Sequence, residues 1–160
     1  MIGVDLGLNV GSITRIDKEG RVKDSLVFKF TDEKEIKDEQ KRLFKIAWRF
    51  AKEILSHPDQ WVALEEPVFS WGRKNPKGFS KNVAVLWLVH YMLWNHGHKG
   101  KILWINNKTA KRLAGGGGKD KAAMIAAFKK KTGNFPGHST KYGQETLADS
   151  YFIALAGYET

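Results

Sequence analysis

The segment MIGVDLGLNVGSITRI, residues 1–16, decides how the rest of the chain can be arranged. Its first apolar run, Ile2 to Leu6, contains a single acid, Asp5, and a second run, Ser12 to Ile16, follows a connection that has glycine at both ends. Two such runs predict a β-hairpin. A carboxylate inside an apolar strand is costly without a cationic partner. No Lys or Arg lies close by in sequence, so a metal ion is one candidate, and an Asp that caps a turn is the alternative.

Length and composition describe an ordinary globular chain. It has 160 residues, of which 42% are hydrophobic, and it contains no cysteine. The absence of cysteine excludes disulfides and thiolate metal sites, and it fits a reducing compartment. The N-terminus lacks the features of a signal peptide, and the longest apolar stretch, Val83 to Leu93, is too short to span a bilayer. We therefore expect one domain over residues 1–160, without membrane contact, in the cytoplasm of a bacterium or a phage-infected host.

The positive charge is concentrated in one part of the chain. The formal net charge is +10, and the segment from Lys99 to Lys141 holds eleven Lys and Arg residues against one acid, Asp120. The remaining residues carry equal numbers of basic and acidic groups. Such a basic segment in a balanced domain predicts a face that binds a polyanion, and nucleic acid is the first candidate. A merely solvated basic surface is the alternative.

Periodicity predicts the order of the elements. Three strands joined by short turns open the chain, and a helix that Thr31 would cap follows and ends at His57–Pro58. The later expected elements are a strand over Gln60 to Pro67, a helix over Ser80 to Asn95, a strand over Lys101 to Ile105, a short helix through Leu113, and helices over Lys119 to Thr132 and Gln144 to Gly157. This order predicts an α/β fold whose five-stranded mixed sheet has strands 1–3 antiparallel, strands 1 and 4 adjacent, and helices on its flanks.

The expected helix from Ser80 to Asn95 is apolar nearly all round. A helix at the surface of a monomer normally has a polar face. Either the sheet and another helix cover this helix, or a second subunit does. We favour a homodimer interface.

Two loops could touch a nucleic acid. The loop from Val68 to Phe79 combines the aromatics Phe69 and Trp71 with the basic residues Arg73 and Lys74. The aromatics could stack on bases or pack down as a hydrophobic plug. The four glycines from Gly115 to Gly118 could bring backbone amides against a phosphate, or they could form a flexible linker. The residues that a P-loop needs after such a turn are missing.

Four acids can meet at one end of the predicted sheet. They are Asp5, an acid at the end of the fourth strand, and the pair Glu145 and Asp149, which lie one helical turn apart. Alternation along the fourth strand favours Glu65 as the second acid, whereas counting back from the loop aromatic allows Glu66. Carboxylates without His or Cys select hard cations such as Mg²⁺. The alternative for the helix pair is two unrelated acids that face solvent.

The acidic segments resemble those of a known family. Ile2–Gly7, Val62–Glu65 and Glu145–Ser150 are similar to the acidic motifs of RuvC-type Holliday-junction resolvases, which belong to the ribonuclease H-like superfamily. Gly115–Lys121 resembles the family's glycine-rich turn and the basic start of the next helix, and Phe69 stands where the family has a stacking aromatic. The last two acids are four residues apart, as in the phage and mitochondrial branches, whereas bacterial members usually have three.

The resemblance implies a structure-selective endonuclease that resolves four-way DNA junctions by paired nicks. Asp5, Glu65, Glu145 and Asp149 would be the catalytic acids and would bind two Mg²⁺ ions, for which Mn²⁺ can substitute, leaving a 5′-phosphate and a 3′-hydroxyl. The enzyme would act as a symmetric homodimer through helix 80–95 and would need no nucleotide cofactor. The residues expected to contact DNA are Phe69, Trp71, Arg73, Lys74, Lys108, Lys111, Arg112, Lys119 and Lys121.

Three other functions fit parts of the pattern. A related nuclease of the same fold would cut flaps, branched replication intermediates or structured RNA. An ATP-binding domain of the actin and sugar-kinase type would share Asp5-Leu6-Gly7, but such proteins need two lobes and a longer chain. A non-catalytic junction-binding protein would leave the four acids scattered in space.

Overall fold

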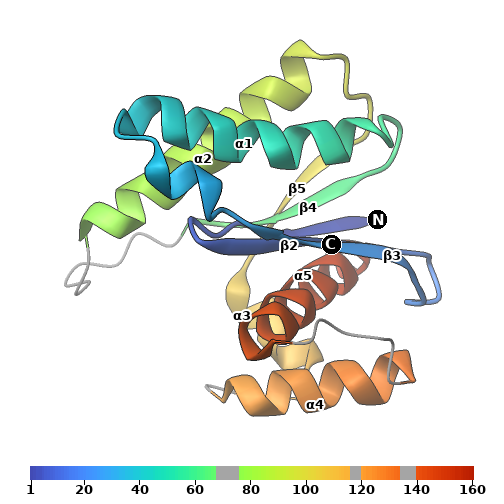
Figure 1. Cartoon of the computed structure of the whole chain (residues 1–160). Coiled ribbons are helices and arrows are strands. Elements are labelled where there is room, and N and C mark those ends of the chain that lie inside the picture. Colours follow the sequence, from blue (N-terminus) through green and yellow to red (C-terminus); the bar gives the residue numbers. More distant parts are fainter. Residues whose placement is uncertain (68–75, 116–119, 134–139) are drawn as a thin grey trace.

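A computed structural model of the chain describes residues 1–67, 76–115, 120–133 and 140–160 (Figure 1). The strands are β1 (Ile2–Asp5), β2 (Val10–Ile16), β3 (Val22–Lys29), β4 (Val62–Glu65) and β5 (Ile102–Ile105). The helices are the 3₁₀ helix η1 (Asp32–Glu35), α1 (Glu39–Leu55), α2 (Pro76–Asn95), α3 (Asn107–Leu113), α4 (Lys121–Thr132) and α5 (Lys141–Glu159).

The five strands form one mixed sheet in the order β3-β2-β1-β4-β5. β1 pairs antiparallel with β2 and β2 antiparallel with β3, whereas β1 and β4, and then β4 and β5, are parallel. The predicted sheet is therefore confirmed, including the adjacency of the first and fourth strands. Each parallel pair is joined by a connection that contains a helix, as parallel pairing requires.

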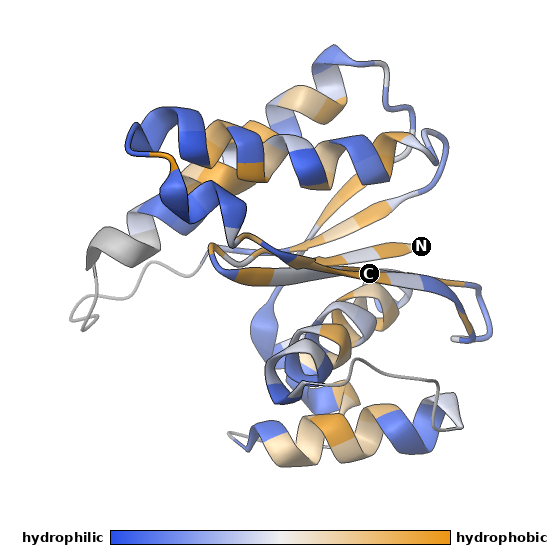
Figure 2. Cartoon of the chain, viewed as in Figure 1, coloured by the Kyte–Doolittle hydropathy of each residue, from blue (hydrophilic) through white to orange (hydrophobic). Residues whose placement is uncertain are grey.

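Helices cover both faces of the sheet and create two cores. α1 and α2 lie on one face, and α5 lies on the other, with α3 and α4 beyond it (Figure 1). One core joins α1 and α2 to the sheet, with Phe50 and Val89 fully buried, and the other forms around α5, with Phe152 fully buried. The central strands are largely hydrophobic, while much of α1 is hydrophilic (Figure 2).

α5 packs directly against the backbone of β1. A Cβ atom at Gly3 would lie 2.0 Å from the carbonyl oxygen of Ser150 and 2.6 Å from the backbone nitrogen of Ala154. No side chain larger than hydrogen fits between the strand and the helix. This close approach places the first turns of α5, which carry two of the predicted acids, beside the end of β1.

The predicted start of the first helix is wrong. The chain forms η1 after Thr31, whose side chain makes no capping hydrogen bond, and then becomes extended at Ile36. α1 begins only at Glu39, because the carboxylate of Asp38 accepts a hydrogen bond from the Lys41 N–H at 3.0 Å and satisfies a free backbone donor.

The later helices keep their predicted identity with shifted starts. α2 begins at Pro76, and α5 begins at Lys141 with Thr140 as its cap. Asn106 caps α3, and Gly133 ends α4 in the left-handed conformation. α2 buries one side, yet Trp87, Tyr91 and Trp94 stay exposed. No helix within the described ranges is long and apolar enough to cross a membrane.

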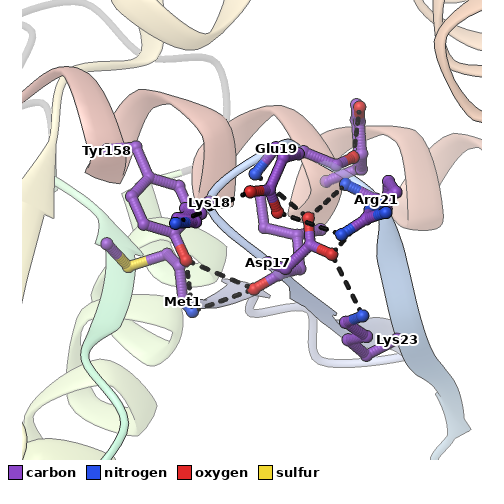
Figure 3. Close-up of polar contacts among 10 residues, drawn as sticks. Met1, Asp17, Lys18, Glu19, Arg21, Lys23 and Tyr158 are labelled. Atoms are coloured by element: carbon purple, nitrogen blue, oxygen red, sulfur yellow. Dashed lines mark hydrogen bonds and ion pairs between the residues drawn. The ribbon is translucent and has the colours of Figure 1, made fainter.

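The turn between β2 and β3 is joined to both chain ends (Figure 3). The Met1 amino group donates to the carbonyl of Ile16 at 3.0 Å and to the hydroxyl of Tyr158 at 3.1 Å. Asp17 accepts from the N–H of Arg21 at 2.9 Å and pairs with Lys23 at 3.0 Å. Desolvation acts to raise the pKa of Asp17, but these hydrogen bonds outweigh it and hold the pKa well below its usual range. The turn therefore stabilises the start of β1 and the end of α5.

Replacing Gly3 with Ala tests the contact between α5 and β1. The added methyl group must displace α5 backbone, so we expect a loss of about 3 kcal/mol or more in the free energy of unfolding, measured by chemical denaturation. Gly97→Ala is the control, because nothing lies within 4 Å of its added Cβ and only the positive φ of 79° is strained. That strain costs about 1 kcal/mol. A Gly3→Ala protein no less stable than Gly97→Ala would contradict the contact.

Candidate active site

Three elements deliver the four predicted acids to the same end of the sheet. Asp5 is the last residue of β1 and Glu65 the last residue of β4. These two strands run parallel with Val4 opposite Leu64, so both carboxylates lie at the same end of the sheet. Glu145 and Asp149 stand on the first half of α5, which packs against β1. The acids are therefore not scattered in space.

The carboxylate charges act on one another. The pKa of Asp5 is raised to about 7, first by burial and then by the negative charge of Asp149, with a further contribution from Glu65. The pKa of Asp149 is raised to about 6 by burial and by the charge of Glu65. The positive charge of Lys121 opposes both shifts. Perturbed carboxylates of this kind are typical of catalytic and metal-binding sites.

Three of the four carboxylates have a partner from the chain itself. The hydroxyl of Thr146 donates to Asp5, and the side-chain amide of Asn107 donates to Glu65. Lys121 pairs with Glu145 at 2.9 Å. Asp149 is half-buried and receives no hydrogen bond or ion pair from the described residues. These partners offset part of the cost of gathering four negative charges.

The donor set fits a hard divalent cation. Carboxylate oxygens without thiolate or imidazole are the ligands that Mg²⁺ prefers. A cation would relieve the repulsion that raises the pKa values of Asp5 and Asp149. Within the described parts of the chain, however, no three His, Cys, Asp or Glu side chains converge closely enough to hold a metal ion. The two-magnesium prediction therefore stays a prediction.

A pocket of about 160 Å³ lies beside the acids. Its charged lining combines Glu65 and Asp149 with Lys111 and Lys121. Its other lining residues are Asn107, Ala110, Met124 and Ile153. A phosphate group bound here could pair with the lysines, and a cation bound here could pair with the carboxylates and the phosphate. Each charge would then have an opposite partner.

The structure distinguishes the two neighbouring glutamates. Glu65 lines the pocket and is half-buried, whereas Glu66 is exposed and its N–H donates to the carbonyl of Ile105 at 2.8 Å. Consecutive strand residues point to opposite faces of a sheet, so only one of the two can face the other acids. The position of Glu65 agrees with the strand-alternation argument.

The predicted DNA-contacting residues fall into two groups. Lys111 and Lys121 line the pocket, Lys108 is exposed on α3, and Arg112 is exposed and pairs with Glu159 at 3.0 Å. Phe69, Trp71, Arg73, Lys74 and Lys119 lie outside the described residues, as do Gly116, Gly117 and Gly118.

Sequence reasoning missed Asn107 and Thr146. Two successive asparagines, Asn106 and Asn107, stand at the start of α3, and only one of them can be its cap, so the other was available for another role. The structure uses Asn106 as the cap and turns Asn107 toward Glu65. Thr146 directly follows a predicted acid, but no local pattern shows that its hydroxyl reaches Asp5.

The raised pKa of Asp5 predicts a pH-dependent effect of Asp5→Asn on stability. The folded protein retains a proton on Asp5 up to about pH 7, whereas the unfolded chain loses it near pH 4, so stability falls as pH rises through this window. In a chelator we expect Asp5→Asn to raise the free energy of unfolding at pH 8 by up to about 4 kcal/mol. The gain should be less than half as large at pH 5.

Urea denaturation of both proteins at the two pH values measures this gain. Asp59→Asn is the matched control, because the Asp59 side chain is 77% exposed and its loss should have no comparable pH dependence. Equal stabilities of the wild-type and Asp5→Asn proteins at pH 8 would contradict the assignment of Asp5 to a buried, repulsive site.

Comparison with known proteins was made at the level of sequence and of structure. No family model matches the chain, and no curated protein matches it in sequence. One similar solved structure is RuvC of Thermus thermophilus in complex with a Holliday junction substrate, with a TM-score of 0.71 and 17% identity, covering 98% of this chain and 92% of that one. A second is a Thermus thermophilus RuvC structure, with a TM-score of 0.69 and 19% identity, covering 98% and 96%. The chain thus has the ribonuclease H-like fold of RuvC, over nearly its full length.

Proposed function

We propose that this protein is a metal-dependent endonuclease that resolves four-way DNA junctions by paired nicks. The observation that carries the proposal is that Asp5, Glu65, Glu145 and Asp149 lie at one end of the sheet in a RuvC-like fold, close enough for their charges to act on one another. These residues come from three separate elements, and gathering their charges costs stability, which favours a site that uses the charge.

The four acids would hold two Mg²⁺ ions, or Mn²⁺ in their place. Bound there, the ions would supply activation of a water molecule and stabilisation of the charge that develops on the phosphate. The chain provides the rest of the site. Thr146 and Asn107 hold Asp5 and Glu65, and Lys121 balances the charge of Glu145.

The basic residues next to the acids would bind the DNA backbone. Lys111 and Lys121 enter the pocket itself, and Lys108 and Arg112 extend the positive surface along α3. The residues Lys129, Lys130 and Lys131 add exposed charge at the end of α4. A phosphate in the pocket would lie between Lys111 and Lys121 on one hand and Glu65 and Asp149 on the other. The proposed hydrolysis would leave a 5′-phosphate and a 3′-hydroxyl.

Paired nicks need two sites, and α2 supplies a surface on which two copies could meet. Trp87, Tyr91 and Trp94 are 53%, 55% and 74% exposed. They are spaced four and three residues apart, so they share one face of the helix. Large exposed aromatics on one face are typical of protein interfaces. We assign this aromatic face of α2 to a homodimer contact.

A nicking assay on a synthetic four-way junction tests the function, with linear duplex, a flap and a structured RNA as alternative substrates. We expect paired Mg²⁺-dependent nicks in the junction alone. Asp5→Asn and Glu65→Gln should each lower the cleavage rate by at least about 100-fold, because loss of a ligand removes several kcal/mol of stabilisation. Junction binding, measured by gel shift, should persist because the basic residues are unchanged.

Glu66→Gln is the matched control for Glu65→Gln, and it should cleave like the wild-type protein because Glu66 is exposed and is not among the residues that line the pocket. Junction cleavage that survives Asp5→Asn would overturn the assignment. Preferential cleavage of flaps or RNA would move the function to a related nuclease, and tight junction binding without cleavage would indicate an architectural protein.

Charge on the aromatic face of α2 should separate the proposed dimer. We expect the wild-type protein to sediment as a dimer and the double variant Tyr91→Glu with Trp94→Glu to sediment as a monomer, because two desolvated carboxylates would face each other across the contact. Leu26→Glu is the control, because it adds a charge at an exposed apolar residue that is not part of the aromatic face of α2. Leu26 is 41% exposed and lies on β3, at the opposite edge of the sheet from β5. A monomeric wild-type protein would contradict the interface.

A further inference from the structure

A chain of buried hydroxyl groups crosses from β2 to α5 and ends at Asp5. Ser12 and Thr14 are two residues apart on β2, so their side chains lie on the same face of the sheet. Ser150 and Thr146 face them from one side of α5. The Thr14 and Ser150 hydroxyls lie 2.7 Å apart, those of Ser150 and Ser12 2.8 Å apart, and the hydroxyl of Ser12 donates to the backbone carbonyl of Thr146 at 2.7 Å. Thr146 is 5% exposed and the other three are fully buried.

One arrangement of protons satisfies every member of this chain. Each hydroxyl has a single proton to donate. The Thr146 carbonyl can only accept, so the proton of Ser12 is used there. Ser150 donates to the carbonyl of Leu147 at 3.2 Å and can accept from Thr14. The proton of Thr146 is then free for Asp5, whose carboxylate can only accept when it is ionised.

Thr146 has little freedom to move. It lies on the helix that packs against the backbone of β1 at Gly3, so its Cα cannot shift without displacing α5. Its branched side chain has few accessible rotamers. Its hydroxyl lies 3.1 Å from that of Ser12, on the strand residue paired with Asp5. The hydroxyl is therefore fixed from both the helix and the sheet.

We propose that Thr146 is a positioning residue, which holds the Asp5 carboxylate in the orientation that binds the metal ion. This inference rests on the proposed metal-dependent function. Among the described residues, Thr146 makes the only hydrogen bond to the Asp5 carboxylate, and it reaches one oxygen, Oδ2. The second oxygen of the carboxylate stays available for a cation. Partners of this kind orient a ligand and raise its effective affinity for the metal.

Mn²⁺ affinity, measured by calorimetry on the metal-free protein without DNA, tests this role. Thr146→Val keeps the shape of the side chain and removes the hydroxyl, so we expect its affinity to fall about tenfold or more. Thr146→Ser retains the hydroxyl and should bind Mn²⁺ within about twofold of the wild-type protein. The same ranking should appear in the Mn²⁺ concentration that half-saturates junction cleavage.

Thr132→Val is the matched control. Thr132 stands at the end of α4, where its hydroxyl donates to the carbonyl of Phe128 at 2.8 Å, and its loss should leave Mn²⁺ affinity unchanged. Should Thr146→Val fail to fold, as judged by thermal unfolding, Thr146→Ala carries the same expectation, because it removes the hydroxyl without burying another methyl group.

Wild-type affinity in Thr146→Val or Thr146→Ala would overturn the positioning role, as would a Thr146→Ser protein as weak as Thr146→Val. Failure of the proposed function gives a different result. A wild-type protein that binds Mn²⁺ but nicks no junction would overturn that function, and a tenfold loss of affinity in Thr146→Val would still support the role of Thr146.

Discussion

The direct packing of α5 on the backbone of β1 is the constraint on which the site depends. Gly3 leaves no side chain between the two elements, so the hydroxyls of α5 come within hydrogen-bond distance of β2 and of Asp5. A bulkier residue at this position would separate the helix from the strand and move Glu145 and Asp149 away from Asp5. The glycine in the opening strand therefore has a functional consequence as well as a packing one.

Gathering the acids costs stability that the chain recovers only in part. Burial and mutual repulsion raise the pKa values of Asp5 and Asp149 to about 7 and about 6, so each carboxylate is harder to ionise in the folded protein than in the unfolded chain. Thr146, Asn107 and Lys121 offset some of this cost through direct contacts. A site that is strained while metal-free and relieved by a cation couples metal binding to stability.

Local patterns were sufficient to predict the sheet and the end of it at which the four acids lie. The alternation of β1 to β3, the acid at the end of β4 and the spacing of Glu145 and Asp149 are all visible within short windows of sequence. The start of α1 was misjudged because Thr31 was expected to cap it, and only the folded chain shows that Asp38 bonds to the free backbone donor. The contact of Thr146 with Asp5 joins residues 141 positions apart, so periodicity carries no sign of it.

Two explanations for the apolar character of α2 were open from the sequence, and packing within the single chain accounts for one side of the helix. Val85, Val89 and Leu93 are buried in the core that α1 and the sheet share, which explains one side within a single chain. Packing inside the monomer leaves the aromatic face unexplained, since Trp94 remains 74% exposed. α2 also follows β4 closely in sequence, so a contact between two α2 helices would hold both Glu65 residues in a defined relation. Two cuts in one branched substrate require such a relation, because independent sites would release a singly nicked product.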